Sequence, residues 1–257
     1  MQELRVSLLF IISVLGLSCG PGKFVYKVEN LKVSSATAKD SSMALFIAPY
    51  KDSLKIFTSG IVGRTDTGYF PERPSSNLGN LCADLVFRFS DSILTAQLGF
   101  KLDMAVLNTG GLRTALPNGE ITMGNIYEVM PFENSVVVLK LSGSAMDSLF
   151  RHIIRRGGEP IAGVKLEIEE YQQFTAWIGQ RRFDSRRDYW VATSDYIAFG
   201  GDGFNMLKNP MQIVYLKKTL RDVLIEGVQN ETNRFGVVQK RTERRIVYAN
   251  EAGVPKK

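Results

Sequence analysis

The chain of 257 residues carries a formal net charge of +6, with 44% hydrophobic and 23% charged residues. These fractions are ordinary for a globular protein and set aside a wholly disordered chain, which would be poorer in hydrophobic residues. The positive charge suits an anionic small ligand, a nucleic acid or an acidic membrane equally, so charge alone excludes none of these partners.

The N-terminus has the order of parts of a secretory signal. Arg5 supplies a positive charge, and residues 6–17 form an apolar run that is too short to span a bilayer comfortably. The run leads into Leu-Ser-Cys-Gly, which resembles the lipobox of bacterial lipoproteins, where the cysteine is acylated and becomes the new N-terminus. We therefore expect residues 1–18 to be a lipoprotein signal peptide and Cys19 the lipidation site of an exported protein anchored to a bacterial membrane, in the outer membrane and periplasm or at the cell surface. The alternative is a plain signal peptide in which Cys19 is incidental.

The remaining chain is predicted to hold one domain. Polar residues 19–43 are interpreted as a tether, residues 44–250 as the folded domain and residues 251–257 as a tail. Cys82 lies in an apolar stretch and is expected to be a buried, inert thiol. Acylation of Cys19 would leave Cys82 as the one remaining cysteine, and no internal disulfide could then form.

Apolar spacing predicts an irregular alternation of helices and strands along the domain. Residues 44–57 fit a helix or a strand, and Thr122 is the expected cap of a short helix. Helices are further predicted at 78–89, 121–130 and 145–154, strands at 104–107, 135–141, 164–168 and 189–193, and a strand followed by a helix within 211–226. This order favours an α/β (α+β) domain with a single mixed β-sheet packed with helices, and not a barrel or a doubly wound sheet.

Three turn segments carry the chemistry of the chain, and each adjoins a predicted strand. They are NTGGLR at 108–113, PFEN at 131–134 and YIAFGGDGF at 196–204. Paired glycines allow close approach of the backbone to a ligand, and an arginine fork suits a carboxylate, a phosphate or a diol. Taken singly, the segments have plainer interpretations: a tight turn with a surface arginine, a core phenylalanine at a strand end, and an Asx turn.

Together with NLGN at 77–80 and GEIT at 119–122, these segments match five ordered motifs of a known family. The chain resembles the C-terminal domain of the 5'-nucleotidases, also called UDP-sugar hydrolases, over about residues 60–230. The resemblance implies a fold of that type and a substrate that is a nucleotide or a nucleoside.

The resemblance also implies roles for individual residues. Phe132 and Tyr196 match the two aromatic residues that sandwich the base, and Asp202 matches the carboxylate that holds the ribose hydroxyls. Asn108 and Arg113 match the polar pair near the base and the ribose-phosphate side. The family has a further arginine shortly before the NLGN segment, for which Arg73 is the choice here although an ungapped count falls on its neighbour. The family has Phe where Tyr196 stands, so its hydroxyl needs a partner.

A complete 5'-nucleotidase also has a calcineurin-like domain that holds two metals through several His, Asp and Asn residues. The sequence here has one histidine, His152, which is expected to be an exposed helix residue. We therefore expect no catalytic residue, metal or cofactor site in this chain, and a separately encoded calcineurin-like metallophosphatase as partner. The alternative is a non-catalytic surface lipoprotein that binds nucleotides or nucleosides; a structural lipoprotein that has lost its ligand is weaker still. The basic clusters at 181–182, 186–187 and 241–245 lack interleaved aromatic residues beyond Phe183 and Tyr189, so nucleic-acid binding is not expected.

Overall fold

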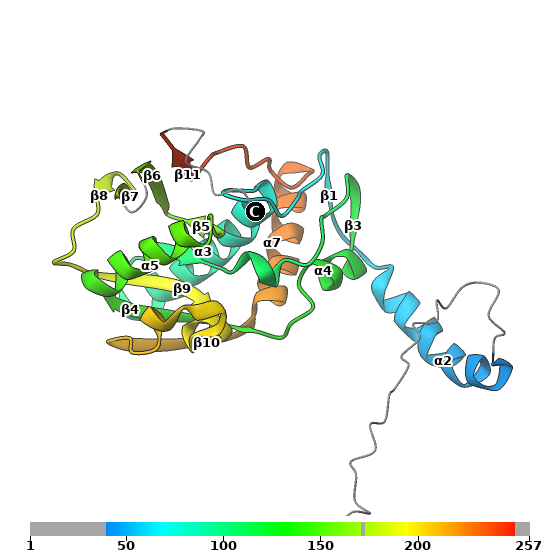
Figure 1. Ribbon diagram of the computed structural model, residues 1–257. Helices are drawn as coiled ribbons and strands as arrows, with labels where there is room; N and C mark the ends of the chain where they lie inside the picture. The colour runs from blue at the N-terminus through cyan, green and yellow to red at the C-terminus, as the bar shows by residue number, and fades with distance from the viewer. Residues whose placement is uncertain (1–39, 171–172, 250–257) are drawn as a thin grey trace, which may run out of the picture. The chain divides into compact units, whose positions relative to one another are not determined.

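A computed structural model describes residues 40–170 and 173–249 (Figure 1). The predicted signal peptide, Cys19, most of the tether and the tail lie outside the described residues. The chain divides into two compact units, Met1–Ala48 and Pro49–Lys257. Helix α2 (Ser41–Thr58) begins two residues before the predicted end of the tether at residue 43, and none of its residues is buried. Among the described residues, no helix combines the length and apolar character that crossing a bilayer requires.

The central element of the second unit is a five-stranded mixed sheet with the order β10-β4-β9-β2-β5. Strand β9 is antiparallel to β4 and parallel to β2. The strands span Met104–Val106 (β2), Ser135–Ser142 (β4), Ile161–Ala162 (β5), Asp188–Ser194 (β9) and Gln212–Thr219 (β10). The predicted α/β class with helices packed on mixed sheet is confirmed.

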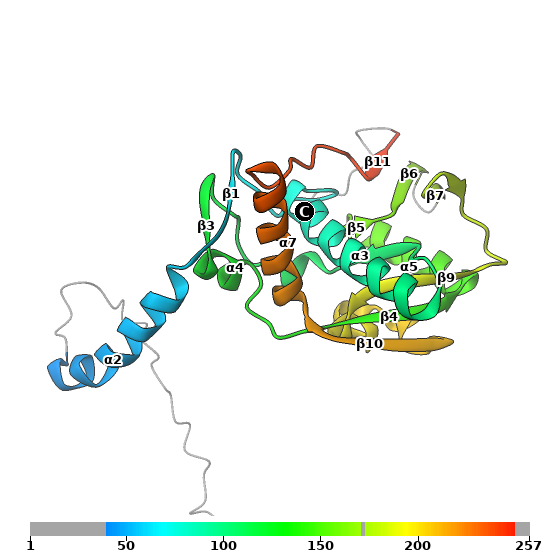
Figure 2. The same cartoon turned by 180° about the vertical axis from the view of Figure 1, so that it is seen from behind.

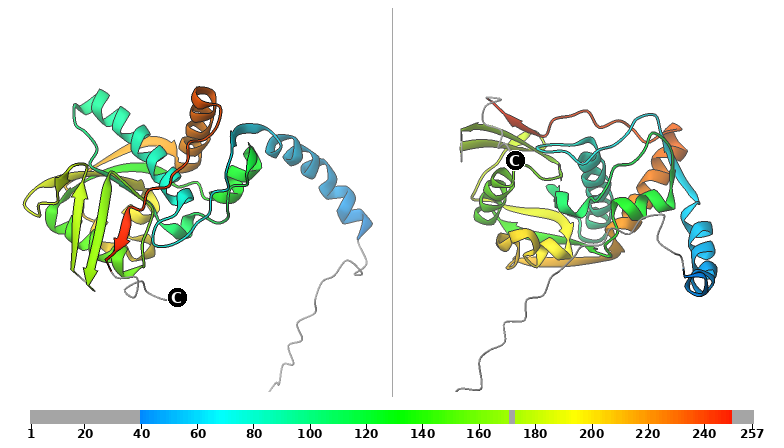
Figure 3. Two further views of the ribbon diagram at one scale, coloured as in Figure 1. Left: turned by 90° about the horizontal axis from the view of Figure 1, so that it is seen from above. Right: turned by 45° about the vertical axis from the view of Figure 1, so that its right-hand side comes forward.

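The described strands form three sheets where one was expected (Figure 3). A two-stranded sheet pairs β1 (Ile61–Thr65) with β3 (Gly119–Thr122). A four-stranded sheet has the order β11-β6-β7-β8, with β6 at Val164–Glu170, β7 at Gln173–Ile178, β8 at Arg181–Arg182 and β11 at Ile246–Tyr248. Gly163, with φ of 78°, turns the chain from β5 in the central sheet into β6 of the other. A Cβ atom at this glycine would lie 2.5 Å from the Asp103 carbonyl oxygen, so the break between the sheets needs glycine.

Helices cover both faces of the central sheet (Figures 1 and 2). Strand β4 alternates strictly: Val136 and Val138 face one hydrophobic core, whereas Val137, Leu139 and Leu141 face the other. Helices α3 (Asn77–Leu98) and α7 (Leu220–Phe235) close the first core, and α5 (Gly143–Arg155) with β6 and β7 closes the second.

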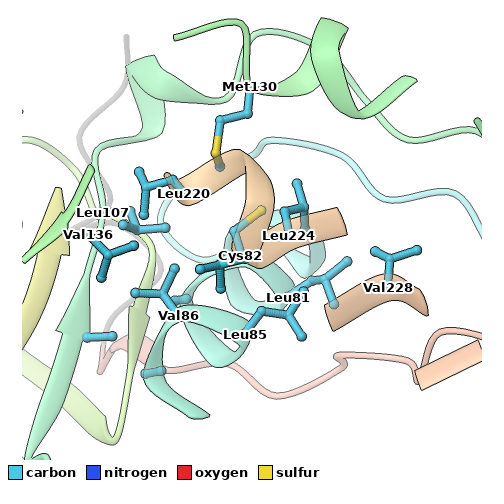
Figure 4. Packing of buried hydrophobic residues seen from close by; sticks show 14 of the residues in the cluster. Leu81, Cys82, Leu85, Val86, Leu107, Met130, Val136, Leu220, Leu224 and Val228 are labelled. Atoms are coloured by element: carbon cyan, nitrogen blue, oxygen red, sulfur yellow. The ribbon is translucent and has the colours of Figure 1, made fainter. Parts of the chain in front are cut away.

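Helix α3 follows from its local sequence. Ser76 caps its N-terminus by accepting a hydrogen bond from the Gly79 amide, and Gly99 ends it in the left-handed conformation. The predicted apolar face at 78–89 packs against α7 (Figure 4). Cys82 lies on this face, and burial raises the pKa of its thiol to about 12, as expected for an inert cysteine.

Candidate functional site

One edge of the central sheet gathers the three turn segments. Strands β2 and β9 are parallel and end together, at Val106 and Ser194. Strand β4 is antiparallel to β9, with Val136 opposite Ser194, so the segment before β4 lies at the same edge. The segments 108–113, 131–134 and 196–204 therefore meet in space although about ninety residues separate the first from the last.

Asp202 is the polar centre of this edge. Its Oδ1 accepts a hydrogen bond from the Tyr196 hydroxyl at 3.0 Å, and its Oδ2 accepts one from Asn108 Nδ2 at 2.9 Å. Arg156 forms an ion pair with Oδ2 at 3.4 Å and also donates to the Asp202 carbonyl oxygen at 3.2 Å. Three donors from three segments thus fix one carboxylate, whose side chain keeps 24% of its surface exposed.

The glycines around Asp202 shape the loop for this carboxylate. Asp202 has φ of 53°, and Gly200 and Gly203 have φ of 93° and 78°, so the backbone turns through left-handed conformations that aspartate tolerates better than most residues. A Cβ atom on Gly201 would lie 2.5 Å from Cζ of the Tyr196 ring. The ring therefore rests against the Gly201 backbone, which leaves no room for a side chain there.

Tyr196 and Phe132 both present aromatic surface to solvent. Tyr196 lies in the short helix α6 (Asp195–Ala198) and is 45% exposed; Phe132 is 46% exposed in the turn between α4 (Met123–Val129) and β4. The plainer interpretation of Phe132 as a core residue is therefore wrong. The hydroxyl of Tyr196 has the partner that the sequence required, and this hydrogen bond raises the pKa of the tyrosine.

Hydrogen bonds from Arg221 hold the turn that carries Phe132. This buried arginine, at the start of α7, donates to the carbonyl oxygen of Pro131 at 3.1 Å and pairs with Glu133 at 3.0 Å. Its guanidinium also stacks over the Tyr127 ring, 4.1 Å from the ring centroid. Arg221 belongs to none of the five motifs, and nothing in the neighbouring sequence distinguishes it from other residues of a helix.

The two arginines predicted to bind the ligand, Arg113 and Arg73, differ in how far they are exposed to solvent. Arg113 is exposed; its backbone amide bonds to Val129 of α4 and its guanidinium to the Gly110 carbonyl oxygen, at 2.8 and 3.2 Å. Arg73 is part-buried and donates to the carbonyl oxygens of Arg156 and Gly158. The described contacts of Arg73 reach neither Asp202 nor the two aromatic rings, so they are structural.

Glu159 was not identified from the sequence, yet its side chain links the segments that carry Arg73, Thr109 and Arg156. Its side chain is fully buried and accepts hydrogen bonds from Arg73 at 3.1 Å and from Arg156. Its other oxygen accepts from the backbone amide and the hydroxyl of Thr109, at 2.6 and 2.7 Å. No pattern around Glu159 signals this role, because only Arg156 is a sequence neighbour, whereas Arg73 and Thr109 lie in distant segments.

The other two motifs are structural in their described contacts. Asn77 bonds to the backbone of Phe70 and Gly68, and Asn80 donates to the Glu243 carbonyl oxygen, so both tie loops to the start of α3. Thr122 caps α4 in a reciprocal capping box with Asn125, as the sequence predicted for Thr122.

His152 is buried, and the prediction that it is an exposed helix residue is wrong. Its ring packs edge-on against Phe204, with 4.5 Å between ring centroids, because this position of α5 turns toward the GGDG loop. Burial and the nearby Arg156 charge lower the pKa of His152. Within residues 40–170 and 173–249, no three His, Cys, Asp or Glu side chains lie together as metal ligands.

The geometry defines an α/β domain with two exposed aromatic rings and a fixed carboxylate at one sheet edge. The family model "5'-nucleotidase, C-terminal domain" matches residues 61–209, which include all six predicted binding residues. The chain belongs to this family.

Similar proteins agree with this assignment. The chain is 23% identical to a 5'-nucleotidase of Diplobatis ommata over 95% of this chain and 47% of that protein. It is 28% identical to a 5'-nucleotidase of Vibrio parahaemolyticus, over 68% of this chain and 31% of that protein. The chain thus spans about half, or less, of the length of these curated relatives.

Solved structures show the same fold. A 5'-nucleotidase precursor from Thermus thermophilus superposes with a TM-score of 0.68 at 24% identity, covering 82% of this chain and 43% of that one. A putative 5'-nucleotidase from Staphylococcus aureus gives a TM-score of 0.58 at 14% identity, with 85% and 45% of the two chains covered.

Proposed function

We propose that the sheet edge around Asp202 binds a nucleotide or a nucleoside. The observation that carries the proposal is the fixed Asp202 carboxylate beside an exposed tyrosine ring, with exposed Phe132 at the same edge. Aromatic faces stack on any base, and a carboxylate accepts hydrogen bonds from ribose hydroxyls. Asn108 and Arg113 supply further polar groups at this edge, Arg113 with an exposed guanidinium suited to a phosphate.

The hydrogen bonding of Asp202 leaves room for a ligand. A carboxylate has about four acceptor positions. Tyr196 takes one on Oδ1, and Asn108 with Arg156 takes two on Oδ2. One position on Oδ1 stays open for a sugar hydroxyl, and binding there leaves the Arg156 contact with Oδ2, at 3.4 Å, in place.

Calorimetric titration of residues 20–257 with adenosine, AMP, UMP and UDP-glucose tests the proposal. We expect saturable binding of at least one ribonucleoside or ribonucleotide, with the preferred ligand identifying the base and phosphate number. Absence of binding for all four would overturn the proposal.

We further propose that this domain supplies the base and ribose pocket for nucleotide hydrolysis together with a separately encoded calcineurin-like metallophosphatase. Support comes from the relatives, which carry the name 5'-nucleotidase and are about twice as long or longer, and from the single, buried histidine of this sequence. Residues 20–257 alone should release no phosphate from AMP with Mn, Co or Zn ions present. Activity that survives repurification would contradict this, and activity that appears only on adding a metallophosphatase would support it.

The second candidate is a non-catalytic lipoprotein that captures nucleotides or nucleosides at the cell surface. Nucleotide binding without hydrolysis in the presence of any candidate metallophosphatase favours it. Both candidates share a proposed lipid anchor at Cys19, motivated by the Leu-Ser-Cys-Gly segment. Cys19→Ser should leave the protein unprocessed or released from the membrane; unchanged mass and unchanged membrane association would contradict the anchor.

A further inference from the structure

A buried charge cluster contacts the segments that carry the proposed site. Its centre is Glu159, the fully buried carboxylate that accepts hydrogen bonds from Arg73, Arg156 and Thr109. A buried carboxylate is stable only when its charge and lone pairs are satisfied, and here two guanidiniums, an amide and a hydroxyl do so. The cluster therefore has one well-defined arrangement.

This arrangement reaches the pocket by two routes. Through Thr109, Glu159 holds the residue next to Asn108, whose amide bonds to Asp202. Through Arg156, Glu159 holds the guanidinium that contacts both the carboxylate and the carbonyl oxygen of Asp202. Both routes end on the same aspartate.

All three nitrogens of the Arg156 guanidinium are engaged in this role. Its Nε bonds to Glu159, one terminal nitrogen to the Asp202 carbonyl oxygen and the other to Asp202 Oδ2. Lysine has a point charge and cannot span these acceptors at once. The contacts of Arg156 thus couple the buried carboxylate to the exposed one through a rigid planar group.

We propose that Glu159 and Arg156 are positioning residues that hold Asp202 in the orientation that binds a ribose diol, and so set the preference for ribose over deoxygenated sugars. This inference rests on the proposed function, because it needs Asp202 to contact the sugar. It assigns to the buried pair a role in ligand discrimination, whereas a purely structural pair would contribute to stability alone.

The test compares Glu159→Gln and Arg156→Lys with a matched control. Glu231 is a second buried carboxylate, on α7, which pairs with Arg88 and Arg241 and accepts from the Gln239 amide at 2.9 Å. Its side chain is 5% exposed and none of these partners belongs to the proposed pocket. Glu231→Gln therefore removes the same kind of buried ion pair without touching Asp202.

Affinities for adenosine and 2',3'-dideoxyadenosine are measured for each folded variant by calorimetry. We expect Glu159→Gln and Arg156→Lys to lose roughly tenfold in adenosine affinity, which corresponds to about 1.4 kcal/mol, with little loss for the dideoxy analogue. Glu231→Gln should keep the wild-type ratio of the two affinities. Arg156→Lys serves as the test if Glu159→Gln does not fold, because Arg156 is 30% exposed and its replacement disturbs the core less.

A second readout needs no ligand. Hydrogen exchange at residues 108–113 and 200–204 should be faster in Glu159→Gln and Arg156→Lys than in wild type, and unchanged there in Glu231→Gln. A wild-type ratio of affinities together with wild-type exchange would overturn the positioning role. Wild-type protein that binds neither nucleoside would instead overturn the proposed function, and faster exchange in the two variants would still support the coupling.

Discussion

The Tyr196 hydroxyl donates to Asp202 Oδ1 at 3.0 Å, so the ring proposed to stack on a base and the carboxylate proposed to hold a ribose are directly joined. The Tyr196 ring also rests on the Gly201 backbone, next to Asp202 in the chain. The two groups consequently keep a fixed separation, which suits a rigid ligand such as a nucleoside.

Replacing this hydroxyl separates the two roles of Tyr196. In Tyr196→Phe the ring stays over Gly201, so adenosine affinity should change by no more than a few-fold. In Tyr196→Ala a stacking face is lost, and binding should weaken by about 1–3 kcal/mol. Titrations of both variants measure this difference. Equal losses in the two variants would show that the hydroxyl, and not the ring, carries the contribution.

Removing the Phe132 ring should weaken nucleotide binding without destabilising the domain. The ring is 46% exposed, so Phe132→Ala removes little buried surface, and its melting temperature should stay close to that of wild type. The affinity should fall by about 1–3 kcal/mol per lost stacking face. Both quantities are measured on the same samples. A lower melting temperature with unchanged affinity would show that the exposed Phe132 ring does not contact the ligand.

The charge of Asp202 should matter for hydroxyl-bearing sugars in particular. Asp202→Asn keeps the shape but removes the negative charge that pairs with Arg156 and gives one oxygen in place of two. We expect adenosine to bind more weakly while 2',3'-dideoxyadenosine changes little, because only adenosine offers hydroxyls to this group. Parallel calorimetric titrations compare the two ligands. An equal loss for both would place Asp202 outside the sugar contact.

Arg113 should contribute mainly to phosphorylated ligands. Its guanidinium is exposed and donates one hydrogen bond to the Gly110 carbonyl oxygen, so further donors remain for a ligand. Arg113→Ala should weaken AMP more than adenosine, and the difference should shrink at high salt because an exposed charge pair is screened. Titrations at 50 mM and 500 mM salt check this, and a salt-independent difference would indicate a desolvated contact instead.

Cys82 should resist modification in the folded protein. Burial raises the pKa of its thiol from the ordinary 9.0 to about 12, so the reactive thiolate is rare at pH 8. Iodoacetamide should label Cys82 only after unfolding, in protein that lacks Cys19.

The same pKa shift makes the stability of the protein depend on pH. The Cys82 thiol ionises at lower pH in the unfolded chain than in the folded protein, so the stability that it contributes is complete below pH 9 and is lost between about pH 9 and 12. Cys82→Ala should therefore lose less stability than wild type over this range, as measured by denaturant unfolding.

Local patterns in the sequence determined much of the fold. The apolar spacing at 78–89 predicts α3 because one helical face must be buried, and Thr122 predicts the start of α4 because its hydroxyl satisfies a free amide. The turn motifs likewise identify Asn108, Tyr196 and Asp202, which the structure brings into one hydrogen-bonded group. The predictions of α3 and α4 succeed because each depends on neighbours within one or two turns of chain.

Only the tertiary structure decided how distant charges are paired. Glu159, Arg156 and Arg221 lie in ordinary sequence, and their roles arise from partners that α/β folding brings from up to ninety residues away. Arg73 binds the buried Glu159 and His152 packs under the GGDG loop for the same reason. The break between the central sheet and the four-stranded sheet also falls at a single glycine, Gly163, between β5 and β6. Burial and long-range pairing are properties of the packed chain, and a local pattern of residues does not contain them.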